Sequence, residues 1–132
     1  MQFIDANIFL EVLLKQKRTK ECKAYLKRVE TRQLTALTTD FIVDTISIIM
    51  DDAGCTPAQL RTFQLSLLKY EGLTLYDLTM ADRVAATKLM EKHKLDFDDA
   101  TVYAAMMSTG TKEVVSMDRK FDRIEGITRI EP

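Results

Sequence analysis

The fold shows first in the stretch Phe3-Ile4-Asp5-Ala6-Asn7-Ile8-Phe9-Leu10. Two apolar residues suited to a buried strand end at an acid, and an apolar pattern with helical spacing follows directly. The same unit, a short strand followed by a helix, recurs along the chain. This alternation predicts an α/β fold with a mostly parallel sheet that is covered by helices on both faces.

Changes in the hydrophobic period mark the expected elements. Thr56-Pro57-Ala58-Gln59 has the composition of a capped helix start. Gly54, Gly72 and Gly110 each follow a helical pattern, where a left-handed cap would fit. The predicted helices cover residues 7–16, 19–30, 40–53, 57–70, 79–93 and 98–109, and the predicted strands cover residues 3–4, 34–37, 73–75, 114–116 and 127–130.

Composition excludes several classes of protein. The 132 residues, 46% hydrophobic and 30% charged, fit one globular domain over residues 1–132. No apolar run approaches the ~20 residues of a membrane span, and the N-terminus does not resemble a secretory signal. The formal net charge of -1 excludes a broadly basic nucleic-acid coat, although a local basic patch is still allowed.

Cysteine and histidine are scarce. Cys22, Cys55 and His93 are the only residues of these two types, so a four-ligand zinc set is excluded and a disulfide framework is not expected. This usage predicts a reducing, cytoplasmic location. The chemistry of the chain is therefore expected to come mainly from carboxylates.

Acidic residues stand where predicted strands end and predicted helices begin. Asp5 and Asp118 follow strands, Asp99 lies in the first turn of a helix, and Asp44 lies among apolar residues near the start of another. Ligands of parallel sheets bind beyond the carboxyl ends of the strands. Capping explains acids such as Asp40 and Asp96 or Asp98. Asp5 and Asp44 have mainly apolar neighbours, so each needs a hydrogen-bond partner, a cation or a raised pKa. Several acids in one pocket would need a cation, and oxygen ligands favour Mg²⁺ or Mn²⁺.

Four short motifs, in order along the whole chain, together resemble the PIN domain family and the VapBC-type toxins within it. They are residues 3–10, the stretch Thr38-Thr39-Asp40-Phe41-Ile42-Val43-Asp44, the stretch Leu95-Asp96-Phe97-Asp98-Asp99-Ala100, and residues 115–127 around Ser116-Met117-Asp118-Arg119-Lys120-Phe121. The resemblance implies a three-layer α/β/α sandwich with a mostly parallel central sheet of about five strands.

The resemblance also implies a function. A chain of this family is expected to be a metal-dependent ribonuclease that hydrolyses RNA phosphodiester bonds, as the toxin of a toxin–antitoxin pair. Its partners would be RNA, a small antitoxin protein and a second copy in a homodimer. The expected catalytic residues, which would hold one or two Mg²⁺ or Mn²⁺ ions, are Asp5, Asp44, Asp99 and Asp118, with Asp122 as a further candidate ligand. The expected substrate-binding residues are Asn7, Ser116, Arg119, Lys120 and Arg123.

Asp44 departs from the family pattern, in which the second acid is usually Glu. The aspartate keeps the charge but draws its carboxylate back by about 1.5 Å. This departure supports an alternative interpretation, a catalytically weak or silent PIN-like domain that binds RNA or a protein. A phosphoryl-transfer enzyme with Asp5 as nucleophile is disfavoured, because the chain lacks an Asp-x-Asp pair and a Gly-rich phosphate loop.

Charge is distributed unevenly along the chain. Residues 1–33 carry 8 basic and 4 acidic residues, whereas residues 34–110 carry 6 basic and 11 acidic residues. The basic stretch over residues 15–32 is expected to flank the acidic pocket and to bind RNA phosphates. The surplus apolar surface of the helices 40–53 and 57–70 suggests a homodimer face.

Overall fold

The computed structural model describes all residues from 1 to 132. Its centre is a five-stranded sheet with the strand order β3-β2-β1-β4-β5. Every neighbouring pair of strands is parallel, where the sequence predicted a mostly parallel sheet of about five strands. The strands are β1 (Gln2–Ile4), β2 (Ala36–Thr39), β3 (Leu73–Tyr76), β4 (Glu113–Val115) and β5 (Thr128–Ile130).

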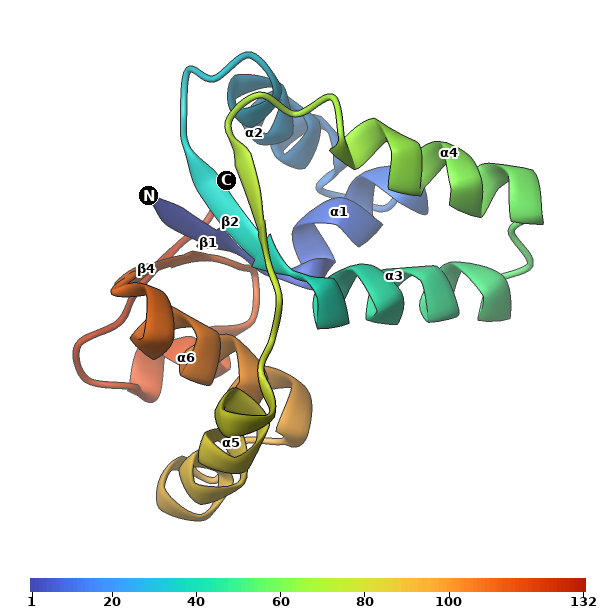
Figure 1. Cartoon of the computed structure of the whole chain (residues 1–132). Helices are drawn as coiled ribbons and strands as arrows, with labels where there is room; N and C mark the ends of the chain where they lie inside the picture. Colours follow the sequence, from blue (N-terminus) through green and yellow to red (C-terminus); the bar gives the residue numbers. More distant parts are fainter.

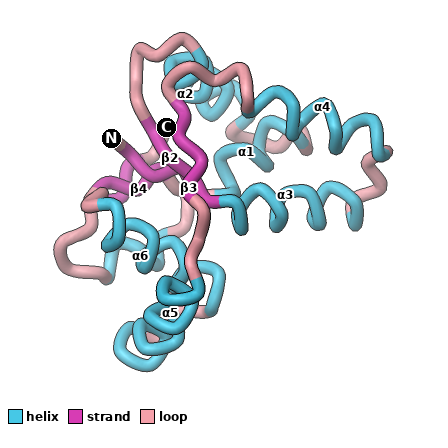
Figure 2. Tube along the Cα trace, in the orientation of Figure 1, coloured by secondary structure: helices cyan, strands magenta, loops and turns pink.

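Helices cover both faces of this sheet, which confirms the predicted three-layer sandwich. Figure 1 shows α1 to α4 together on one side of the sheet and α5 and α6 on the other. In Figure 2 the strands lie in the middle, between these two groups of helices. The helices are α1 (Ala6–Leu13), α2 (Thr19–Glu30), α3 (Asp40–Asp52), α4 (Pro57–Leu67), α5 (Met80–His93) and α6 (Phe97–Thr109), and η1 (Arg119–Arg123) is a 3₁₀ helix.

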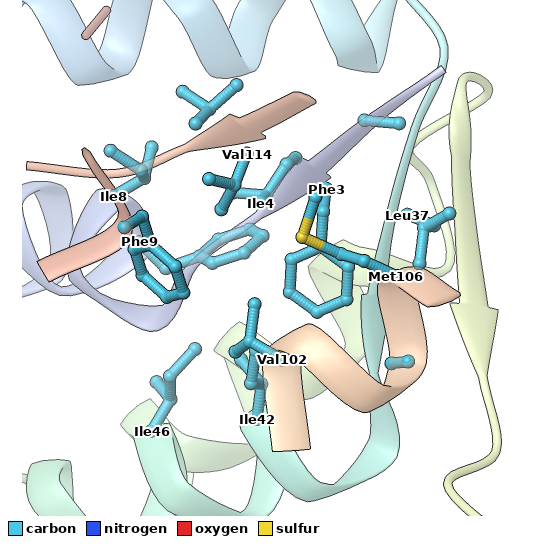
Figure 3. Close-up of a cluster of buried hydrophobic side chains, with 14 of the residues drawn as sticks. Phe3, Ile4, Ile8, Phe9, Leu37, Ile42, Ile46, Val102, Met106 and Val114 are labelled. Carbon is cyan, nitrogen blue, oxygen red and sulfur yellow. The ribbon is translucent and has the colours of Figure 1, made fainter. Parts of the chain in front are cut away.

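The core lies between the layers. Phe3 and Ile4 of β1 are both completely buried, because successive strand residues face opposite sides and helices cover both sides. Figure 3 shows side chains from β1, β4, α1, α3 and α6 gathered in this cluster. The short strand β1 therefore lies at the centre of the core, and Asp5 follows directly after it.

Several local features differ from the sequence prediction. The first helix ends at Leu13 rather than near residue 16, and β2 begins two residues later than expected. Gly54 and Gly110 adopt the predicted left-handed conformation, but Gly72 does not. A Cβ at Gly72 would lie 2.3 Å from the carbonyl oxygen of Leu34, so this glycine is required for close chain approach. None of the helices combines the length and the apolar character that a membrane span requires.

Candidate active site

The strand order creates a crevice beyond the carboxyl end of β1. The chain runs outward from β1 to β2 and β3, then crosses to the other side for β4 and β5. The boundary between β1 and β4 is thus the switch point at which α/β sheets bind ligands. A cavity of about 250 Å³ lies there, lined from α1, α3 and α6 and from the residues that follow β1 and β4. Its lining contains no Lys, Arg or His, and its acids are Asp5, Asp96, Asp98, Asp99 and Asp118.

Asp5 follows β1 and caps the N-terminus of α1. Its Oδ1 accepts a hydrogen bond from the backbone N–H of Ala6 at 2.8 Å. Its Oδ2 accepts from the hydroxyl of Ser116 at 2.7 Å and from the side-chain amide of Asn7 at 3.2 Å. Burial raises the pKa of Asp5, although the hydrogen bonds from Ser116 and Ala6 act in the opposite direction. The carboxylate is therefore fixed in orientation and aimed into the cavity.

Ser116 and Asn7, two of the expected substrate-binding residues, connect the ends of β1 and β4. Ser116 is completely buried, and its hydroxyl oxygen accepts from the side-chain amide of Asn7 and from the backbone N–H of Asp118. The Asn7 carbonyl oxygen accepts from the backbone N–H of Met117 at 3.4 Å. These contacts position the two acids relative to each other, so Ser116 orients a carboxylate rather than facing a substrate.

Asp99 and Asp96 come from the start of α6. Asp96 caps this helix by accepting the backbone N–H of Asp99 at 3.1 Å, and this hydrogen bond lowers the pKa of Asp96. Asp99 is 8% exposed, and its Oδ2 is buried without any hydrogen-bond donor. Burial and then the neighbouring Asp96, Asp118 and Asp5 raise the pKa of Asp99 to about 7.

Asp118 begins the 3₁₀ helix η1. Its Oδ1 accepts the backbone N–H of Lys120 at 3.0 Å, so this acid is also a helix cap. The Lys120 ammonium lies 3.4 Å from Asp96 Oδ2 and 3.5 Å from Asp99 Oδ2. Asp5, Asp99 and Asp118 thus line one cavity as the sequence predicted, and Lys120 stands beside them.

Asp44 does not line this cavity, contrary to the sequence prediction. It is exposed on α3, whereas Ile42 and Ile46 are buried against the core. Each residue turns an α-helix by about 100°, which puts Asp44 roughly opposite these two isoleucines. The α3 side chains that reach the cavity are Phe41, Ile42, Thr45 and Ile49. Thr45, one residue after Asp44, lines the cavity instead, and it carries a hydroxyl rather than a carboxylate.

The other expected residues lie outside the cavity. Asp122 is exposed and pairs with Arg129, with 2.9 Å between Asp122 Oδ1 and the guanidinium Nε. This guanidinium also lowers the pKa of Asp122. Arg119 and Arg123 are exposed on η1 and do not line the cavity. Arg129 itself was not anticipated, and it donates to the backbone carbonyl of Ser116 at 3.0 Å.

The basic stretch of the N-terminal quarter does not line the acidic cavity either. Lys20, Lys23 and Lys27 of α2 line a different and larger cavity of about 530 Å³, together with apolar side chains from α1 and α2 and with Tyr70. Direct contact of α2 with a substrate bound at the acids is therefore not supported.

The donor set of the cavity suits a hard divalent cation. Its ligands would be carboxylate oxygens, and the buried Asp99 Oδ2 has no hydrogen-bond donor of its own. As the side chains stand, no three acidic, His or Cys groups are close enough together to share one ion. Asp5, Asp99 and Asp118 are the residues that would hold the ion.

Comparison with known proteins places the fold. The PIN domain family model matches residues 3–127. The chain is similar to VapC20 of Mycobacterium tuberculosis, described as a sarcin-ricin loop cleaving toxin, with a TM-score of 0.79 and 15% identity over all of both chains. It is also similar to a chain of a toxin–antitoxin complex from Klebsiella pneumoniae, with a TM-score of 0.74 and 15% identity over all of both chains.

A third similar structure is VapBC2 from Rickettsia felis bound to a DNA fragment of its promoter. Its TM-score is 0.74 at 12% identity, over 98% of this chain and 97% of the other. None of the curated proteins compared with the chain matches it significantly. The solved structures share the fold, and the family match extends over nearly the whole sequence. The chain therefore belongs to the PIN domain family.

Proposed function

We propose that this protein is a metal-dependent endoribonuclease and the toxin of a toxin–antitoxin pair. The observation that carries the proposal is the convergence of Asp5, Asp99 and Asp118 on one cavity at the switch point of the sheet. These acids come from the ends of β1 and β4 and from the start of α6, and no basic side chain lines the cavity with them. The family match and the VapC-like fold support the same activity.

The chain's own residues would orient the reaction. Ser116 and Asn7 each donate a hydrogen bond to the carboxylate of Asp5, and these two bonds fix the orientation of the carboxylate. The caps at Asp96 and Asp118 fix the backbone that carries the other acids. Bound Mg²⁺ or Mn²⁺ would supply positive charge and a water of lowered pKa for phosphodiester hydrolysis. No protein nucleophile is then required.

Basic side chains near the mouth of the cavity are suited to the RNA backbone. Arg119, Lys120 and Arg123 lie on η1, which starts at the cavity residue Asp118, and all three are exposed. Contacts of this kind with phosphates would make RNA binding weaken as salt concentration rises. Because the similar VapC20 is described as cleaving the sarcin-ricin loop, a hairpin RNA of that sequence is the first substrate to test.

We also propose protein partners, a small antitoxin and a second copy of the chain. One similar structure is described as a toxin–antitoxin complex, and another as VapBC2 bound to a DNA fragment of its promoter. Ile48 of α3 is 61% exposed, and Leu65 and Leu68, in and just after α4, are 53% and 76% exposed. This apolar surface on adjacent helices supports a protein interface. Light scattering of the purified chain, alone and with the product of any small adjacent gene in the operon, tests both partners. Such a pair would act in the cytoplasm.

The decisive experiment is an RNA cleavage assay with Mn²⁺, Mg²⁺ or EDTA. Wild-type protein is expected to cut single-stranded or hairpin RNA with either metal and to be inactive in EDTA. The Asp5→Asn, Asp99→Asn double variant should be inactive with both metals. Asp44→Asn is the matched control, because it removes an aspartate charge outside the cavity, and it should cut as wild type does. Cleavage in EDTA, or by the double variant, would overturn the proposal.

The alternative function, an RNA- or protein-binding module without catalysis, is favoured by one observation. Thr45 stands where α3 faces the cavity, so α3 contributes no carboxylate to it. A wild-type protein that binds RNA but leaves it uncut with Mn²⁺ and with Mg²⁺ would establish this alternative.

A further inference from the structure

One basic side chain reaches the acids of the cavity although it does not line the cavity itself. The Lys120 ammonium is 3.4 Å from Asp96 Oδ2 and 3.5 Å from Asp99 Oδ2. No other Lys, Arg or His side chain forms an ion pair with any of the five cavity acids. Lys120 is therefore the resident counter-charge of this cluster.

Asp99 depends most on this lysine. The Asp99 side chain is 11% exposed, and its Oδ2 accepts no hydrogen bond, because the Lys120 ammonium at 3.5 Å is too distant for a good one. A buried carboxylate without a cation or donors is costly. The Lys120 side chain is 48% exposed, so the pair joins a mobile, solvated ammonium to a fixed, buried acid.

The backbone of Lys120 is tied to the same cluster. Its N–H donates to Oδ1 of Asp118 at 3.0 Å, which makes Asp118 the cap of η1. The lysine is thus anchored at its backbone by one proposed ligand of the ion and paired through its side chain with another. An ion that binds Asp99 Oδ2 would need the oxygen with which the ammonium now pairs.

We propose that Lys120 is a positioning residue that competes with the divalent cation for Asp99. Without metal, the ammonium offsets the charge of Asp96 and, where Asp99 is ionised, that of Asp99 as well. When metal binds, the ammonium leaves Asp99 and remains at the cavity mouth, where an RNA phosphate is its next available partner. The inference rests on the proposed function, because it concerns the same acids.

Competition of this kind lowers the apparent metal affinity of the wild-type protein. Removing the ammonium while keeping an unbranched side chain, in Lys120→Met, should free Asp99 Oδ2 for the ion. Ion pairs near a protein surface are worth up to ~1 kcal/mol, or about fivefold in affinity. We therefore expect Lys120→Met to bind Mn²⁺ up to about fivefold more tightly.

The test is a Mn²⁺ titration of the full chain, with free Mn²⁺ followed by electron paramagnetic resonance. Arg119→Met is the matched control, because it removes an exposed positive charge one residue away that pairs with no cavity acid. It should change the affinity by less than about twofold. Lys120→Arg keeps the charge and should stay close to wild type. Circular dichroism of each variant establishes that its fold is retained.

The outcomes separate this inference from the proposed function. Tighter Mn²⁺ binding by Lys120→Met than by both wild type and Arg119→Met supports competition. The same conclusion holds if Lys120→Met binds Mn²⁺ measurably and wild type binds it too weakly to measure. Equal affinities of Lys120→Met and Arg119→Met, or weaker binding by Lys120→Met, overturn the competition while the metal site stands. If no variant binds Mn²⁺, the metal-dependent function fails and the competition fails with it.

Discussion

Replacing Asp99 with Asn should remove a pH dependence from the stability of the metal-free protein. In the folded chain, burial and the neighbouring acids raise the pKa of Asp99 from 3.8 to about 7. Between these two values the folded state holds a proton that the unfolded chain has lost. The free energy of unfolding therefore decreases as pH rises through this window.

The size of the effect follows from the shift. Three units at about 1.4 kcal/mol each give an upper limit of ~4 kcal/mol between about pH 4 and pH 7. Only the part of this window above pH 5 is sampled in the experiment, so we expect a loss of about 2 kcal/mol from pH 5 to pH 7.5. The Asp99→Asn side chain cannot release a proton in this pH range, so the free energy of unfolding of this variant should decrease clearly less.

Urea denaturation in EDTA at a series of pH values measures this difference. All other titrating groups are common to both proteins, so they largely cancel in the comparison. Asp44→Asn, which changes an exposed acid, should retain the wild-type slope. Identical slopes for wild type and Asp99→Asn would refute the claim that this carboxyl keeps its proton up to about pH 7 in the metal-free fold.

Three further substitutions test other parts of the structure. Thr45→Glu should introduce a carboxylate into the cavity and strengthen Mn²⁺ binding severalfold in a calorimetric titration, whereas Asp44→Glu should leave the affinity unchanged, because only position 45 faces the cavity. Ser116→Ala removes a hydroxyl that serves three hydrogen bonds, and should cost about 1–3 kcal/mol of unfolding free energy and weaken Mn²⁺ binding. Gly72→Ala forces a Cβ to 2.3 Å from the Leu34 carbonyl oxygen, so thermal denaturation should show a loss of about 2–4 kcal/mol. A shift of less than about 0.5 kcal/mol would contradict the close approach at Gly72.

Much of the fold could be predicted because hydrophobic period and capping are local signals. The order of strands and helices follows from them, and strands that end in an acid pointed correctly to Asp5 and Asp118. Parallel topology then brings these ends to one edge of the sheet. Residues far apart in sequence could therefore be assigned to one cavity.

The structure places Asp44 outside the cavity, which could not be predicted because sequence spacing gives a residue's position but not which way it points on a helix. On α3, a one-residue difference turns a side chain by about 100°, from the cavity at Thr45 to solvent at Asp44. The pattern of Ile42, Ile46 and Met50, four residues apart and all buried, carried the missing information. The direction of these three buried side chains indicates that Thr45 lies nearer than Asp44 to the buried face of α3.

Interactions between distant charged side chains could not be predicted. Nothing in the sequence distinguishes Lys120, which reaches the acids across the cavity mouth, from Arg119 beside it. The position of the basic stretch on α2 could not be predicted for a similar reason. Net charge along the sequence does not show which face of the molecule a helix occupies, and α2 lines a different cavity.

The most direct test of the central claim is the rate of RNA cleavage in Mn²⁺ by two single variants measured side by side. Asp99→Asn removes a carboxylate from the cavity, and Asp44→Asn removes one from the solvent face of α3. We predict a rate at least about 100-fold below wild type for Asp99→Asn and a rate within about twofold of wild type for Asp44→Asn. A fully active Asp99→Asn, or an inactive but folded Asp44→Asn, would contradict the assignment of this cavity as the nuclease centre.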